Sequence, residues 1–181
     1  IVLDKTRAGL WRGQQGYQAG AVQLGLPHFC PTGNRNHQII GETAQKRRAF
    51  AGALMAKTAK ALAEALDKEG VPIHAIAKEA TTSHQFAIEA HQFGGGQQAA
   101  KLLRRANILS CGIGLPIEPL SGDLNGLRLG TPEIVRWGMR PQEMPDLARL
   151  LARVLVRGEN PERVAAEVTE FKGRFDRLHF V

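Results

Sequence analysis

The sequence predicts an α/β chain, a two-layer α+β sandwich in which a small, mostly antiparallel sheet has its helices packed on one face. Helical and strand-like patterns follow in the order helix, strand, strand, helix, strand, strand and helices, with short links between them. A long alanine-rich helical run comes first. Of the 181 residues 43% are hydrophobic, which is enough for the core of one globular domain.

The first 36 residues are expected to form loops and weak elements, because they hold six glycines and several glutamines without periodicity. Over residues 37–67 the pattern becomes helical. Apolar residues there recur at steps of three and four, as at Leu62 and Leu66. Gly70 follows, and glycine is common just beyond a helix C-terminus.

The middle of the chain is predicted to alternate between strands and one helix. Residues 73–77 and 84–90 are predicted strands, and in the second of them apolar and polar residues alternate. Three consecutive glycines at 94–96 predict a turn, and an amphipathic helix is expected over residues 97–105.

The last third of the chain is predicted to be mainly helical. Residues 108–113 and 127–129 are the remaining predicted strands, separated by a loop that contains proline. Helices follow over residues 132–137, 142–157 and 161–173, and the first and last of them open on a proline, which suits the first helical turn.

The net charge of +7 raises the question of a nucleic-acid partner. The 24 lysines and arginines are scattered over predicted helical faces, however, and aromatic residues make up only 6% of the chain. Solvated helix faces therefore explain the charge better than a nucleic-acid surface does. No apolar run reaches the length of a membrane span, so we expect no membrane partner.

The two cysteines, Cys30 and Cys111, lie far apart and outside any metal-ligand spacing. We interpret them as free thiols of a reducing compartment and expect a cytoplasmic protein. The chain opens at Ile1 in what resembles the end of a strand, and no signal peptide is visible. We therefore expect it to be the C-terminal part of a longer protein.

Arg128 is the most informative candidate site residue. It lies between Gly126 and Gly130 in an alternating run, directly before Thr131 and Pro132, where Thr131 is expected to cap the next helix. A solvated surface arginine is one interpretation. The other is a binding residue, since a guanidinium presents paired donors in a plane that matches a carboxylate. The two glycines are expected to leave room on both sides of it.

Four segments, in this order and spacing, resemble the serine hydroxymethyltransferases, pyridoxal-phosphate enzymes of the aspartate-aminotransferase-like fold. They read "TAKALAEAL", "TTSHQFAIEA", "AKLLRRANILSCGIGLP" and "GLRLGTPEIVRWGM". The last segment is the most specific of the four. The other three are weak individually, and their shared order is what supports the resemblance. The resemblance covers residues 37–181, the family's small C-terminal domain. It implies that residues 1–36 are an irregular remnant of the connection to the large domain and active site.

The resemblance also implies an amino-acid substrate, a pyridoxal phosphate cofactor and a homodimer that includes a large domain. The arginine of the family's G-x-R-x-G-T-P motif, here Arg128, binds the substrate α-carboxylate. Lys5, in "KTRAG", matches the lysine that bonds the cofactor aldehyde, although Asp4 replaces the family's histidine. Gly33 is the residue of "CPTGNRNH" that could stand in the family's phosphate-binding loop. His84 matches the histidine of its T-x-N-H strand, and we expect it to be structural.

Three departures concern the reaction. Ile113 stands where the family has an asparagine that holds the pteridine of tetrahydrofolate, so folate as a cofactor is in doubt. Trp137 and Val135 replace an arginine and a threonine, as expected of a divergent member.

The resemblance implies pyridoxal-phosphate-dependent retro-aldol interconversion of a β-hydroxy amino acid, of the serine or α-methylserine type, with glycine or its analogue. A folate-independent aldolase or transaldolase is one alternative. The other two are a non-catalytic relative and a basic nucleic-acid-binding module. The fragment alone is expected to be inactive.

Overall fold

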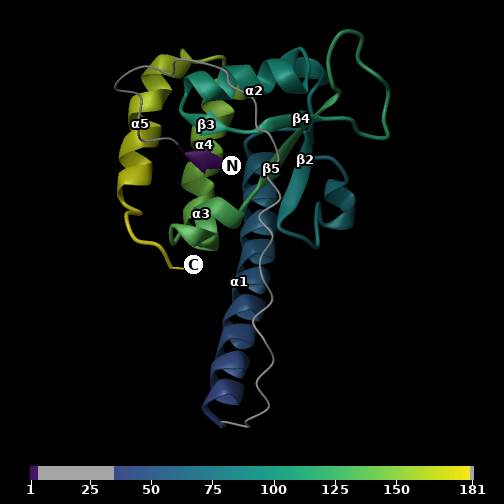
Figure 1. The fold of residues 1–181 in the computed structure, drawn as a ribbon. Helices are drawn as coiled ribbons and strands as arrows, with labels where there is room; N and C mark the ends of the chain where they lie inside the picture. Colours follow the sequence, from purple (N-terminus) through teal and green to yellow (C-terminus); the bar gives the residue numbers. More distant parts are fainter. Residues whose placement is uncertain (4–34, 180–181) are drawn as a thin grey trace, which may run out of the picture.

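The computed structural model describes residues 1–3 and 35–179, which Figure 1 shows as a ribbon. Helices and strands follow one another along the chain, with three short 3₁₀ helices between them at Ile76–Lys78, His91–Phe93 and Pro141–Glu143. The main elements are β1 (Val2–Leu3), α1 (Arg35–Lys68), β2 (Gln85–Glu89), α2 (Gly96–Arg105), β3 (Ile108–Leu109), β4 (Cys111–Ile113), β5 (Gly126–Gly130), α3 (Pro132–Arg136), α4 (Met144–Leu155) and α5 (Pro161–Gly173).

The principal sheet has three antiparallel strands in the order β2-β5-β4, so that β5 is its central strand. β1 and β3 form a separate antiparallel pair. The helices α1 and α2 contact the principal sheet, and α4 packs against both of them (Figure 1). The predicted class, a small antiparallel sheet with helices on one face after a long helix, is confirmed.

One face of the principal sheet forms the core, because successive side chains of a strand point to opposite faces. Phe86 and Ile88 of β2 and Leu127 and Leu129 of β5 are buried against the helices. Apart from Gly126, which is buried beneath Leu115, the alternate positions carry residues that are exposed or half-buried, and Arg128 lies among them. The sheet therefore keeps one open face within the part of the chain that the structure describes.

The long helix α1 reaches this core with the C-terminal part of its length. Leu62 and Leu66, four residues apart, are fully buried, as the helical periodicity predicts. The N-terminal part of α1 extends away from the other elements in Figure 1, and Phe50 on it is 59% exposed.

A carboxylate from the loop before β5 caps the start of α2. Asp123 Oδ1 and Oδ2 accept hydrogen bonds from the backbone N–H groups of Gln97 (3.0 Å) and Gln98 (2.9 Å), and Oδ1 also accepts from Leu124. Desolvation alone would raise the pKa of Asp123, but these three donors outweigh it and hold the pKa below its usual value. The ionised carboxylate of Asp123 is therefore the form that makes the hydrogen bonds between the loop and α2.

Asp123→Asn is expected to destabilise the chain at neutral pH but not in acid. A carboxylate whose pKa is lowered on folding stabilises the fold above its unfolded-state pKa, and that contribution is lost as pH falls through the folded-state pKa. Denaturant midpoints of the variant and the parent should therefore differ at pH 7 and converge in acid. Asp176→Asn, at an exposed aspartate near the C-terminus, is the matched control and should leave the midpoint unchanged at both pH values. A difference for Asp123→Asn that does not vary with pH would contradict the assignment.

Two predicted strands are wrong in detail. Residues 73–77 form only a one-residue bridge, from Ile73 to Ile88, because Ala75 adopts a left-handed conformation and a 3₁₀ helix follows. Residues 108–113 are divided at Ser110 into β3 and β4, which belong to different sheets. The expected side-chain cap at Thr131 is also wrong.

The buried Thr131 hydroxyl instead joins three elements. Its Oγ1 lies 2.7 Å from the carbonyl oxygen of Met55 on α1 and 3.2 Å from that of His84, which precedes β2. The hydroxyl therefore ties the end of β5 to the long helix and the neighbouring strand.

Among the described helices, none combines the length and the apolar character that crossing a bilayer requires.

Candidate functional site

Arg128 occupies the middle of the central strand and not its end. It is the third residue of β5, where it lies opposite Ala87 of β2 and Cys111 of β4. β2 and β4 pair with β5 along its two edges, and the neighbouring Leu127 and Leu129 are fully buried in the core. The backbone that carries Arg128 is therefore held in place. A side chain on such a strand has a more rigid mount than one on a loop.

The guanidinium of Arg128 is exposed on the open face of the sheet. The structure gives it no hydrogen bond or ion pair with any described residue. It lines a shallow depression of about 560 Å³ whose wall also includes Gln85, Gly130 and Glu133. A free cation at the edge of a concave surface can accept an anionic group from outside the described chain.

The two glycines beside Arg128 differ in the space they leave. A Cβ at Gly126 would lie 2.6 Å from Leu115 Cγ, so that side is already filled. A Cβ at Gly130 would meet nothing closer than 3.6 Å, an ordinary contact. The expectation of room on both sides is therefore correct at Gly130 and wrong at Gly126.

A second polar group with unused hydrogen-bonding capacity lines the same depression. Ser110 Oγ is buried and has no hydrogen-bond partner among the described residues. Buried hydroxyls are normally satisfied, because an unpaired one loses its hydration without compensation. The Ser110 hydroxyl therefore retains unused hydrogen-bonding capacity next to the depression.

An acidic side chain on the rim is fixed in place. Glu133, in the first turn of α3, accepts a hydrogen bond from Trp137 Nε1 at 2.9 Å, and its other oxygen lies 3.9 Å from Arg136 Nη1. The sequence interpretation missed Glu133 as a site residue. The Glu-x-x-x-Trp spacing, which places both side chains on one helix face, is the signal that could have found it.

His84 also lines the depression, with an exposed side chain. Its backbone carbonyl accepts a hydrogen bond from Thr131 N at 2.9 Å. The backbone of His84 thus contacts the end of β5, whereas its exposed imidazole is not packed, and the structural role expected for His84 stays a prediction.

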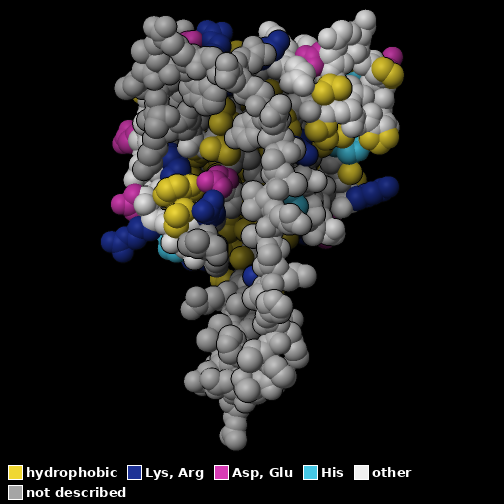
Figure 2. Space-filling model, viewed as in Figure 1, with side chains coloured by type: hydrophobic (Ala, Val, Ile, Leu, Met, Phe, Trp, Pro, Cys, Tyr) yellow, Lys and Arg dark blue, Asp and Glu magenta, His cyan; other side chains and the backbone are white. Residues whose placement is uncertain are grey.

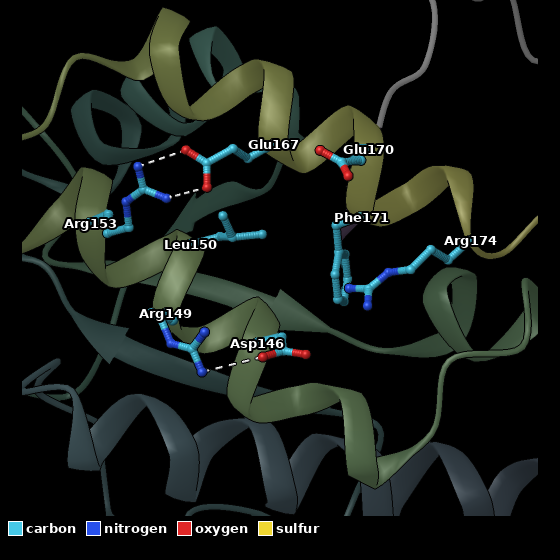
Figure 3. A pocket seen from close by; sticks show the side chains of 8 residues that line it. All are labelled: Asp146, Arg149, Leu150, Arg153, Glu167, Glu170, Phe171 and Arg174. Atoms are coloured by element: carbon cyan, nitrogen blue, oxygen red, sulfur yellow. Dashed lines mark hydrogen bonds and ion pairs between the residues drawn. The ribbon is translucent and has the colours of Figure 1, made fainter.

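In a second concave surface, between α4 and α5, Arg149 and Arg153 each pair with an acidic side chain (Figure 3). Two hydrogen bonds join the Arg153 guanidinium to Glu167, at 2.6 and 2.8 Å, and Arg149 lies 3.2 Å from Asp146. The bond to Arg153 holds the pKa of Glu167 below its usual value. The Arg153–Glu167 pair joins α4 to α5, whereas Arg128 has no such partner among the described residues.

Among the described side chains on the face that Figure 2 shows, basic residues do not gather into a patch. Lys and Arg side chains appear there as separate groups, with Asp and Glu side chains among them. This distribution supports the interpretation of the net charge as solvated helix faces.

The cofactor residues expected from the sequence, Lys5 and Gly33, lie outside the described residues, as does Cys30. Cys111 is a free cysteine, half-buried on β4. Within the described residues, no cluster of three or more histidine, cysteine or acidic side chains could hold a metal ion. The described wall of the depression contains no lysine, so it offers groups for a substrate and none for an aldehyde cofactor.

No family model matches the chain. Among curated proteins, it is 61% identical over 127 residues to an α-methylserine aldolase from a Ralstonia species. That match takes in 70% of this chain and 29% of the relative. It is 42% identical over 124 residues to the serine hydroxymethyltransferase of Pyrobaculum neutrophilum, which takes in 68% of this chain and 29% of the relative. The chain therefore spans less than a third of the length of these relatives.

A solved structure has the same fold over most of the chain. It is the L-threonine transaldolase of Pseudomonas fluorescens in its internal aldimine state, with a TM-score of 0.59 and 26% sequence identity. The likeness covers 68% of this chain and 28% of the transaldolase.

Proposed function

Because about 70% of the chain is similar to the corresponding part of an α-methylserine aldolase and of a serine hydroxymethyltransferase, we propose that it forms the small C-terminal domain of a pyridoxal-phosphate-dependent enzyme. The enzyme interconverts a β-hydroxy amino acid, of the serine or α-methylserine type, with glycine or its analogue by retro-aldol chemistry. Residues 37–181 form the domain, and residues 1–36 belong to the connection with a large domain. The partners are that domain and a second copy of the chain, in the cytoplasm.

One observation carries the proposal for this chain's own residues. Arg128 is a guanidinium with no hydrogen-bond or ion-pair partner among the described residues, on a central strand beside an open Gly130, on the face of the sheet opposite the buried core. Its paired donors suit the two oxygens of an α-carboxylate. We assign the α-carboxylate of the amino-acid substrate to Arg128.

The role of Arg128 goes beyond affinity. A carboxylate held by two parallel hydrogen bonds cannot rotate freely, so the α-carbon attached to it is fixed relative to the rest of the site. Pyridoxal phosphate, when bound, supplies the electron sink for charge that develops at that carbon. Ser110 lines the same depression, and its hydroxyl has no partner among the described residues.

We propose Lys5 as the residue that holds the cofactor aldehyde and Gly33 as a contact to its phosphate. Both assignments rest on the sequence alone. The described residues fit the substrate end of such a site, since they offer a cation and a hydroxyl.

The aldolase reaction without folate is favoured over folate-dependent transfer. Ile113 lies half-buried on β4, on the same face as Arg128, and offers no hydrogen-bonding side chain to a pteridine. The α-methylserine aldolases also have the higher identity with this chain among the two relatives compared.

To test this proposal, pyridoxal phosphate is added to the full-length protein that contains this chain. We expect an absorbance band of the lysine-bound cofactor, and we expect the protein to release formaldehyde from α-methylserine without tetrahydrofolate. Absence of the band would contradict the proposal. Formaldehyde transfer only with serine and tetrahydrofolate would favour the hydroxymethyltransferase.

Gly130→Ala is expected to fold normally and to weaken substrate binding. The added Cβ makes only ordinary contacts, yet it projects on the same face as the Arg128 side chain and narrows the depression. We expect an increase of about tenfold in the KM for the amino acid, with an unchanged melting temperature. Gly173→Ala, at the exposed end of α5, is the control, since a Cβ there meets nothing within 4 Å. An unchanged KM would show that ligands do not approach Arg128 from the side of Gly130.

A further inference from the structure

Glu133 is a negative charge on the rim of a depression whose proposed ligand is an anion. It shares the wall of that depression with Arg128, and it lies in the first turn of α3 just beyond the end of β5. By Coulomb repulsion an acid at this place weakens the binding of anions, and most strongly the binding of those that carry more than one negative charge.

The position of Glu133 is fixed by a chain of contacts that begins in α5. Lys172, only 4% exposed, places its ammonium 4.0 Å from the ring centre of Trp137 and donates to the Phe175 carbonyl at 2.7 Å. The indole so held donates its N–H to Glu133 at 2.9 Å. A cation over an aromatic face is favourable and restricts the ring. The carboxylate therefore has a defined place on the rim.

A purely structural role would account for part of this geometry. Acidic residues in the first turn of a helix interact favourably with its positive end, and a contact between residues four apart supports the helix. Support of the helix alone does not require the Glu133 carboxylate to line the same concave surface as Arg128, which has no described partner. The two roles differ in what they predict for ligand selectivity.

We propose that Glu133, positioned by Trp137, is a specificity-determining residue that restricts the Arg128 site to amino acids with a single carboxylate. This proposal rests on the assignment of the α-carboxylate to Arg128. A ligand with one carboxylate places it on the guanidinium. A second carboxylate on the ligand's side chain then meets the fixed negative charge of Glu133, and like charges brought together discriminate against the ligand that carries them.

The test measures competitive inhibition of the full-length enzyme by L-asparagine and L-aspartate, which have nearly the same shape and differ in one charge. We expect the parent enzyme to bind asparagine more tightly. Glu133→Gln keeps the acceptor for Trp137 but removes the charge, and should reduce this preference by about fivefold to tenfold. Trp137→Phe keeps the ring beneath Lys172, loses the donor, and should reduce the preference by a smaller factor. Added salt should reduce the preference of the parent but not that of Glu133→Gln.

Glu170→Gln is the matched control, since Glu170 is an exposed acid of α5 outside the depression. It should leave the preference for asparagine unchanged. An unchanged preference in Glu133→Gln would overturn the inference, provided that Arg128→Ala weakens both inhibitors. If Arg128→Ala weakens neither, the carboxylate assignment itself fails. These outcomes separate the failure of the inference from the failure of the proposed function.

Discussion

Replacing Arg128 with alanine is expected to weaken the apparent affinity of the full-length enzyme for amino acids by about 100-fold, because two charge-assisted hydrogen bonds are lost together. Cofactor binding, followed by its absorbance, should be unchanged. The fold should also be unaffected, since the Arg128 side chain is exposed and has no described partner that its removal would leave unpaired. Steady-state kinetics and thermal unfolding of the same preparations measure both effects.

Two further variants make this result specific. Arg128→Lys retains the charge but not the planar pair of donors, so it should recover only part of the affinity. Arg104→Ala removes an exposed arginine from the last turn of α2 and should leave the affinity unchanged. If Arg128→Ala and Arg104→Ala had equal effects, the loss would reflect net charge and not a carboxylate site.

Replacing Gly96 with alanine is expected to give the largest loss of stability of any single methyl addition considered. An ideal Cβ at Gly96 would lie 1.9 Å from the carbonyl oxygen of Gly126 and 3.0 Å from the Cα of Gly112. Both neighbours are backbone atoms of the sheet, so no side chain can move aside. The start of α2 must then withdraw from β4 and β5, at a cost of about 3 kcal/mol or more in the free energy of unfolding.

Gly52→Ala is the matched control for this variant. Gly52 lies inside α1, where an added Cβ meets nothing within 4 Å. Alanine should raise the free energy of unfolding there by about 0.5–1 kcal/mol, because glycine disfavours the helix. Denaturant unfolding of both variants gives the comparison. A Gly96→Ala midpoint equal to that of the parent would show that α2 does not approach the sheet as closely as described.

Periodicity predicted the elements that are long or strongly patterned. The helices around Leu62 and Leu147 were predicted because each buries one face, and periodic burial appears directly in the sequence. The strand around Phe86 was predicted for the same reason. The helix around Val164 was predicted from the proline that opens it. Residues 73–77 were also predicted to form a strand, but the left-handed conformation of Ala75 ends it, and no periodicity encodes that conformation.

The site was predictable only in part. Arg128 stands in the most specific motif, and the structure places it on the open face of the sheet with no described partner. Glu133 and Ser110 were missed because they join the site through tertiary packing. Glu133 becomes part of it through a contact with Trp137, and Ser110 through the division of one predicted strand between two sheets.

The most direct test is a crystal structure of the full-length enzyme with its amino-acid substrate or a close analogue bound. We expect both oxygens of the α-carboxylate to lie about 2.7–2.9 Å from two nitrogens of the Arg128 guanidinium, above the open face of the sheet. A carboxylate bound by other residues, with Arg128 directed into solvent, would contradict the account.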